Sequence, residues 1–173
     1  RHDLFTEYKA NRQKMPDELV EQLSPLYKII KQMNIPLIAL DGYEADDLIG
    51  TIAKKAEIDD FETYIVTGDK DMMQLVSDKT FVFSPGNRFK PTTTYTINKV
   101  QERWGIGPDQ FIDYLTMVGD SSDNIPGVDG VGPKTARKLL DQYKNIETIL
   151  EHAEEAKNKR VRAGLINGKD LVH

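Results

Sequence analysis

Short apolar runs alternate with segments of helical periodicity through the first half of the chain, and this alternation constrains the fold more than any other feature. The runs at 35–40, 63–67 and 80–84 are expected to be strands, with a helix over 44–57 and a short helical turn over 72–76 between them. This order is typical of a parallel sheet whose strands are joined by crossover helices. We therefore predict an α/β fold.

Helical patterns lie on both sides of this alternating region. Before it, a helix is expected to begin at Pro16, with a kink or a break into two helices at Ser24 because Pro25 follows. After it, the pattern is helical from Ile97 onward, and a helix is predicted over 133–143. The second half of the chain is therefore expected to be mainly helical.

A loop near 85–96 that contains glycine and proline separates the two patterns. We predict two parts, an α/β core within residues 1–90 and a helical subdomain over residues 91–173.

The composition limits the chemistry that is open to the chain. No cysteine is present, which excludes disulfides, thiolate zinc sites and cysteine nucleophiles and fits a cytoplasmic protein. No apolar run approaches the roughly 20 residues that cross a bilayer, so no membrane association is expected. The chain begins at Arg1 without an initiator methionine or a hydrophobic leader, and we expect further residues upstream. No feature predicts an obligate interface, so a monomer is expected.

Three tight groups of acidic residues stand out against a formal net charge of only -5. Two groups directly follow predicted strands and the third follows a predicted helix. Their members are Glu44, Asp46, Asp47, Asp69, Asp71, Asp120 and Asp123. Because the carboxyl ends of parallel strands meet at one edge of a sheet, we expect these groups to converge.

Carboxylates packed together repel one another unless cations neutralise them. Mg²⁺ and Mn²⁺ prefer oxygen ligands, and two such ions can activate water and clamp a phosphodiester during hydrolysis. Each group taken alone could be a set of helix caps or turn formers. The three together favour a site for hard divalent cations, which we expect to be two Mg²⁺ or Mn²⁺ ions.

A glycine-rich passage from Ile125 to Ala136 runs into a basic helix and is typical of a helix-hairpin-helix. Glycines leave backbone amides open, and amides at a helix N-terminus can hold a phosphate. Hairpin carbonyls could also hold a K⁺ ion that bridges to DNA. The alternative is an ordinary connection between two helices. The candidate DNA-binding residues are Gly127, Gly130, Gly132, Lys134, Thr135, Arg137 and Lys138.

Together these motifs resemble the 5′-nuclease domain at the N-terminus of bacterial DNA polymerase I and, more broadly, the flap endonuclease family. The resemblance covers nearly the whole chain and rests on Arg1 and the segments 7–12, 43–47, 67–71 and 119–136, which occur in family order. It implies a PIN-like core with a helical arch in residues 1–90 and the hairpin subdomain in residues 91–173.

The resemblance also implies roles for individual residues. Glu44, Asp46 and Asp47 correspond to ligands of the first metal or of the edge it shares with the second, and the other four aspartates named above to the shell of the second. Tyr8 and Lys9 would lie on the arch, where Lys9 would stabilise charge on the scissile phosphate and Tyr8 would stack on a base. Arg12 would contact phosphate.

The implied activity is a structure-specific 5′-3′ exonuclease or flap endonuclease that acts on flapped, nicked or gapped DNA, as in the removal of primers and flaps during replication and repair. A polymerase domain could be covalently linked. The family has two further aspartates upstream that are absent from these 173 residues, so weak cleavage or none is expected. Two alternatives stay open, a helix-hairpin-helix module that binds DNA without cleaving it and a PIN-type ribonuclease.

Overall fold

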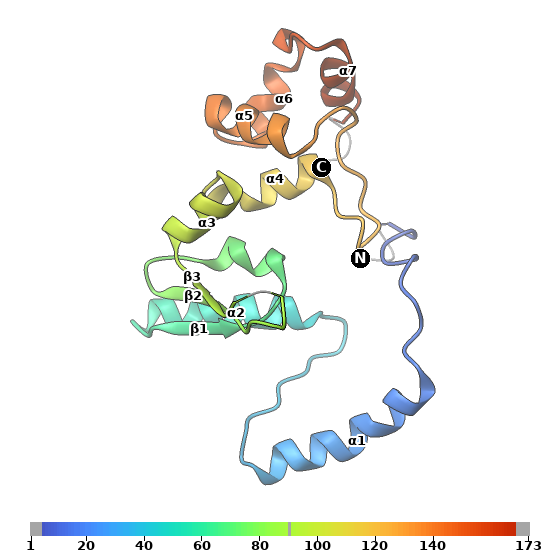
Figure 1. Cartoon of the computed structure of the whole chain (residues 1–173), viewed down its shortest axis with the longest axis vertical. Helices are drawn as coiled ribbons and strands as arrows, with labels where there is room; N and C mark the ends of the chain where they lie inside the picture. Colours follow the sequence, from blue (N-terminus) through green and yellow to red (C-terminus); the bar gives the residue numbers. More distant parts are fainter. Residues whose placement is uncertain (1–4, 90, 169–173) are drawn as a thin grey trace.

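The computed structural model describes residues 5–89 and 91–168 (Figure 1). No helix within these ranges is long and apolar enough to cross a bilayer. In chain order the elements are α1 (Asp17–Gln32), α2 (Ala45–Ile58), β1 (Thr63–Val66), the 3-10 helix η1 (Lys70–Leu75), β2 (Thr80–Ser84), β3 (Thr93–Tyr95), α3 (Ile97–Trp104), η2 (Pro108–Gln110), α4 (Phe111–Val118), α5 (Pro133–Tyr143), α6 (Ile146–Glu151), η3 (Ala153–Glu155) and α7 (Lys159–Asn167).

The sheet has the order β1-β2-β3. Strands β1 and β2 pair in parallel, with Thr63 opposite Thr80, as the alternating pattern predicts. The α/β class is thereby confirmed. Strand β3 pairs with β2 in the antiparallel direction and was missed, because three residues are too few for a periodic signal. Since β3 follows residue 90, the helical part proposed for 91–173 starts with a strand of the sheet. The division stays a prediction.

The strand predicted at 35–40 is wrong. These residues form an extended, exposed connection between α1 and α2. An apolar run becomes a strand only when a neighbouring strand completes its hydrogen bonds, and among the described residues this segment has no such neighbour.

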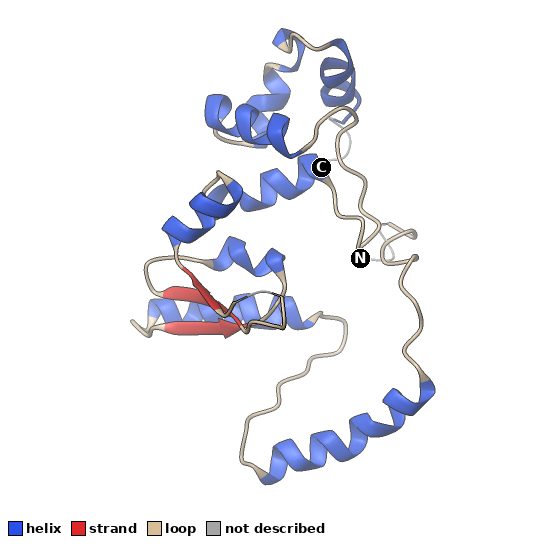
Figure 2. Cartoon of the chain, in the orientation of Figure 1, coloured by secondary structure: helices blue, strands red, loops and turns tan. Residues whose placement is uncertain are grey.

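Helix α1 and its two connections form an arch that extends away from the rest of the molecule (Figure 2). No residue of α1 is buried. One helix runs through Pro25, so a break into two helices at Ser24 is wrong. Proline removes one backbone hydrogen bond, and a helix of 16 residues has enough others on both sides to continue.

The core joins the sheet to the helices that follow it. Val82 of β2, Val100 of α3 and Phe111 at the start of α4 are each 0% exposed. Trp104 links them, since its ring meets Phe111 edge-on at 5.4 Å and Tyr95 at 5.5 Å between centroids. The apolar faces of α3 and α4 therefore hold the helical part against the sheet.

The C-terminal helices pack around the hairpin loop between α4 and α5. Helix α5 has the bounds predicted for it. Gly164 of α7 lies against the hairpin backbone, where a Cβ atom would come within 2.1 Å of the carbonyl oxygen of Asp129. Arg160 of α7 forms a two-point ion pair with the Asp129 carboxylate, with Nη2 and Oδ1 2.7 Å apart. Helix α7 thus packs against the hairpin and stabilises it.

Candidate active site

Two acidic groups begin the helices at the carboxyl edge of the sheet. Asp69 follows β1, and its Oδ1 accepts a hydrogen bond of 2.9 Å from the backbone amide of Asp71 at the start of η1. Asp47 in the first turn of α2 accepts a bond of 2.9 Å from the amide of Glu44. These bonds cap the helix starts, as expected for acidic groups that serve as helix caps. They also fix the two groups at the same edge.

The third acidic group lies in a tight loop after α4. The backbones of Asp120 and Ile125 exchange two hydrogen bonds of 2.9 and 2.8 Å, which close the loop around Asp123. Gly119 enters the loop with φ 76° and ψ 175°, a backbone conformation that is essentially restricted to glycine. A Cβ atom there would lie 2.4 Å from the amide nitrogen of Gly127, so the loop and the hairpin touch backbone to backbone.

The segment before the arch docks on this loop. The amide of Lys9 donates to the carbonyl of Asp123 at 2.9 Å, and the Asn124 side chain donates to the carbonyl of Glu7 at 2.8 Å. Figure 1 shows the segment beside the loop, far from it in sequence. Asn11 adds a third bond, to the carbonyl of Ser121 at 2.7 Å. The beginning of the arch is therefore anchored at the acidic cluster.

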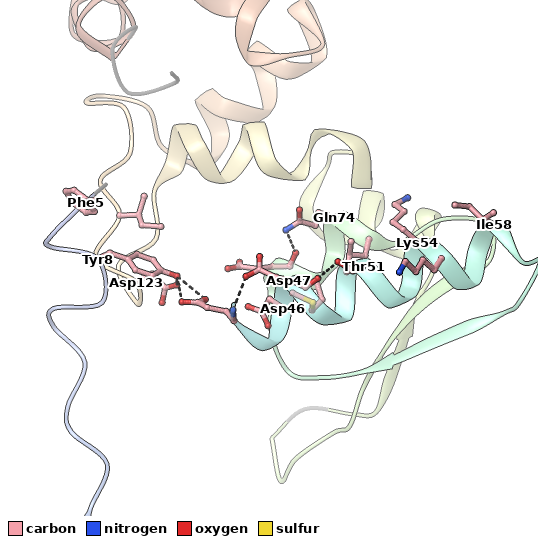
Figure 3. Close-up of a pocket in the computed structure, with 16 residues that line it drawn as sticks. Phe5, Tyr8, Asp46, Asp47, Thr51, Lys54, Ile58, Gln74 and Asp123 are labelled. Atoms are coloured by element: carbon pink, nitrogen blue, oxygen red, sulfur yellow. Dashed lines mark hydrogen bonds between the residues drawn. The ribbon is translucent and has the colours of Figure 1, made fainter. Parts of the chain in front are cut away.

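A cavity of about 770 Å³ lies where these elements meet, and we call it the acidic cavity. It brings together six of the seven predicted carboxylates with four basic side chains. Its charged lining residues are Lys9, Arg12, Glu44, Asp46, Asp69, Lys70, Asp71, Arg103, Asp120 and Asp123. Asp47 lines the adjoining, more apolar cavity of about 940 Å³, in which Tyr8 and Asp123 face the first turn of α2 (Figure 3).

Three of the basic side chains are paired with carboxylates. Lys9 Nζ lies 2.8 Å from both carboxylate oxygens of Glu44. Lys70 Nζ lies 2.9 Å from Asp120, and Arg12 pairs with Asp123. These cations reduce the repulsion that the clustered acids would otherwise feel.

The ion pairs change the pKa values of the groups involved. Burial lowers the pKa of Lys9, but hydrogen bonds to Glu44 and Tyr8 outweigh burial and raise it overall. Burial raises the pKa of Asp120, yet the hydrogen bonds from Lys70 and Ser122 outweigh it and lower the pKa. Both groups are therefore held in their charged forms.

Tyr8 connects two carboxylates. Its ring is only 8% exposed, and its hydroxyl lies 3.2 Å from Glu44 and 3.4 Å from Asp123. In this position Tyr8 is packed between the two carboxylates and leaves little ring surface for stacking. Burial, together with the negative charge of Glu44, raises the pKa of this hydroxyl and keeps it protonated.

Asp71 is the carboxylate that most needs a cation. Burial, followed by the negative charge of Asp69, raises its pKa to about 6. Its Oδ1 atom is buried and has no hydrogen-bond partner. A buried oxygen without a donor is costly, and a hard cation would satisfy it. The donor set around it consists of carboxylate oxygens, which suits Mg²⁺ or Mn²⁺.

The carboxylates surround the acidic cavity without forming a compact ligand set. Across residues 5–89 and 91–168 no group of three acidic or histidine side chains is close enough to hold an ion as it stands. The ion pairs account for this arrangement, because Glu44, Asp120 and Asp123 are turned toward their basic partners.

The hairpin residues lie apart from the acidic cavity, on the loop and first turns of α5. Gly132 precedes the helix, and Lys134 is exposed beside it. Arg137 is half-buried, with its Nε donating to the carbonyl of Pro133 at 3.1 Å. Thr135 and Lys138 line a separate cavity of about 690 Å³ among α5, η3 and α7. Gly127 and Gly130 lie in the loop itself, and Arg1 is outside the described residues.

Sequence reasoning missed several residues of the site. Lys70 stands between Asp69 and Asp71, and this placement was a signal that it could enter the cavity. Arg103 gave no signal, because it lies on an ordinary polar face of α3. Asn11 and Asn124 act only through contacts between segments distant in sequence, which no local pattern reveals.

An α/β core with carboxylates at the carboxyl edge of its sheet, followed by a helical hairpin unit, defines the fold class of the 5′-nucleases. Sequence comparison gives the family itself. Residues 1–105 match the family described as 5′-3′ exonuclease, N-terminal resolvase-like domain. Residues 106–173 match the 5′-3′ exonuclease, C-terminal SAM fold. The chain belongs to the 5′-3′ exonuclease family.

Individual relatives agree with this assignment. DNA polymerase I of Bacillus subtilis is 46% identical over 170 residues, which are 98% of this chain and 19% of the relative. A 5′-3′ exonuclease of Buchnera aphidicola is 41% identical over 162 residues, which are 94% of this chain and 55% of the relative. The chain thus spans about a fifth of the length of the polymerase and about half of the length of the exonuclease.

Solved structures share the fold. The 5′-exonuclease of bacteriophage T5 with bound zinc ions has a TM-score of 0.82 at 24% identity, covering 99% of this chain and 66% of the other. The T5 flap endonuclease in a complex with DNA and metal ions has a TM-score of 0.84 at 23% identity, covering 99% and 65%.

Proposed function

We propose that this chain is the metal- and DNA-binding part of a structure-specific 5′-3′ exonuclease or flap endonuclease, which hydrolyses phosphodiester bonds in DNA with two Mg²⁺ or Mn²⁺ ions. The observation that carries the proposal is the acidic cavity, which is lined by six carboxylates from three segments, among them Asp71 with its buried, unpartnered Oδ1. A fold needs no such concentration of charge, whereas hydrolysis at phosphorus does.

Asp69, Asp71, Asp120 and Asp123 would hold one cation, and Glu44, Asp46 and Asp47 the other or the edge between them. When bound, the ions would supply Lewis acidity toward water and the scissile phosphate. Asp71 fits this role because metal binding would remove the cost of its ionisation. Its pKa of about 6 means that, below this pH, a proton must leave as the cation enters.

The basic residues of the acidic cavity would exchange partners on binding. Lys9, Arg12 and Lys70 now neutralise carboxylates that cations would neutralise in the loaded site. Once replaced there, these side chains can turn toward phosphate oxygens without leaving the cavity. Lys9 lies between two of the acidic groups, with its ammonium group 2.8 Å from Glu44 and 3.9 Å from Asp123. We assign it to the scissile phosphate.

The hairpin would hold duplex DNA independently of sequence. The exposed backbone of Gly132 and the exposed side chains of Lys134 and Lys138 suit contacts with phosphates, and the half-buried Gly130 lies beside them in the hairpin. A K⁺ ion on the hairpin carbonyls is part of the same proposal. The relatives named DNA polymerase I suggest that a polymerase domain is joined to this part in the whole protein.

The test is incubation of this chain with a 5′-flap DNA duplex in Mg²⁺ or Mn²⁺, with enzyme in excess and with EDTA as the control. We expect a rise in melting temperature on metal addition, salt-sensitive flap binding, and slow cutting near the junction that EDTA abolishes. Absence of both metal stabilisation and flap binding would refute the proposal. Binding without any metal effect would favour the non-cleaving module.

Lys9→Met is expected to slow flap cleavage by about tenfold to 100-fold, because a charged hydrogen bond to the phosphate contributes about 1.5–3 kcal/mol. Single-turnover rates in Mn²⁺ at saturating enzyme would measure the loss. Lys14→Met is the matched control, since Lys14 is 88% exposed and pairs with exposed Asp17, away from the acidic cavity. Equal rates for both variants would remove Lys9 from the assigned role.

A further inference from the structure

Arg103 is a basic residue of the acidic cavity that was not expected there and that the proposed function does not use. It lies in the last turn of α3 and lines the cavity together with the carboxylates. Helix α3 contributes none of these carboxylates, so Arg103 comes to the cavity from a separate element.

Two aromatic rings hold this guanidinium in place. Its carbon lies 4.7 Å from the centroid of Trp104 and 5.4 Å from that of Tyr95. It also donates a hydrogen bond to the Tyr95 hydroxyl. Tyr95 is 4% exposed and belongs to the core, so the platform under Arg103 is rigid. A stacked guanidinium keeps its planar edge available for a second partner.

The pairing of Arg103 differs from that of the other three cations. Lys9, Arg12 and Lys70 each have a carboxylate partner, whereas no carboxylate of the described ranges lies within ion-pair distance of Arg103. The aromatic platform keeps it from folding onto the acids. The positive charge of Arg103 therefore does not neutralise any of the clustered carboxylates directly.

We propose that Arg103 binds a phosphate group of the DNA strand that enters the acidic cavity, at a position beside the scissile bond, and so positions that strand. This inference rests on the proposed function. A planar guanidinium on a fixed support suits two oxygens of one phosphate. Stacking for stability alone would be served equally well by a site away from the carboxylates.

The protein contains one tryptophan, and it lies directly under Arg103, so Trp104 fluorescence reports on this position alone. The chain would be titrated with a 5′-flap duplex in Ca²⁺ at several salt concentrations. For Arg103→Gln we expect about tenfold weaker binding and a salt dependence reduced by about one phosphate contact. Arg103→Lys should recover the salt dependence because it keeps the charge.

Lys79→Gln is the control for loss of one charge, because Lys79 pairs with Asp60 ahead of β2, away from the carboxyl edge of the sheet. Its affinity and salt dependence should match the unmodified chain. If folded Arg103→Gln also binds like the unmodified chain, the Arg103 inference fails while the proposed function stands. If the unmodified chain binds no flap DNA in any divalent metal, the inference fails, and if metal also leaves its melting temperature unchanged, the proposed function fails as well.

Discussion

Replacing Asp71 with asparagine is expected to weaken Mn²⁺ binding by about 100-fold or more and yet to raise the melting temperature of the metal-free protein. The loss follows from the position of Asp71, because even residues that only support metal ligands change affinity by about 10–100-fold. Electron paramagnetic resonance or calorimetry with Mn²⁺ would measure the affinity without any need for cleavage.

The gain in stability follows from the raised pKa. The carboxyl of Asp71 has a pKa of about 6 in the folded chain against 3.8 as the ordinary value, so the folded state holds the proton more tightly. Stability is therefore lost as the pH rises from about 4 through 6. After allowance for solvent screening, asparagine should recover about 1 kcal/mol at pH 8, or about 2–4 °C, and nothing near pH 4.

Asp78→Asn serves as the matched control, since Asp78 is exposed in the loop before β2. It should change neither Mn²⁺ affinity nor the melting temperature. Unchanged Mn²⁺ binding in Asp71→Asn would remove Asp71 from the ligand set. A fall in its melting temperature at pH 8 would show that the carboxylate holds the fold, as the non-cleaving alternative requires.

Gly119→Ala is expected to destabilise the protein by about 3 kcal/mol or more, which corresponds to a fall of roughly 6–12 °C. The new Cβ would lie 2.4 Å from the amide nitrogen of Gly127 and 2.7 Å from the carbonyl of Ile125. Both neighbours are backbone atoms that no rotamer change can move. The φ of 76° with ψ of 175° adds strain of its own.

Gly132→Ala gives the comparison within the same passage. Gly132 has φ -100°, and no atom lies within 4 Å of the place that an added Cβ atom would take. We expect thermal unfolding followed by circular dichroism to show a change below about 0.5 kcal/mol for this variant. Equal melting temperatures for the two variants would contradict the backbone contact between the loop after α4 and the hairpin.

Local sequence patterns predicted the elements whose formation depends on nearby residues alone. Strand β2 and helix α5 match their predicted bounds, because apolar periodicity and turn residues act within a short window. The segment 35–40 has the same apolar character but no neighbouring strand among the described residues, and the sequence could not show this. Strand β3 exists only because β2 offers it an edge.

The site shows the same division. The acidic residues were found because they stand next to predicted strand ends, where a sheet brings distant segments together. Their ion pairs with Lys9 and Arg12 depend on how the segment before the arch docks, and the pair of Lys70 with Asp120 depends on the contact between η1 and the loop after α4. Both contacts are tertiary properties. Arg103 belongs to the cavity because its aromatic neighbours direct it there, and a single exposed arginine on a helix gives no sign of that.

The acidic loop after α4 and the hairpin occupy one continuous stretch of chain, from Gly119 to Gly132, with their backbones in contact at Gly127. In the proposed function, one end of this stretch lies where a strand would be cut and the other where the duplex would be held. The backbone contact would then fix the distance between these two places, and an insertion between them should shift the cut along the DNA.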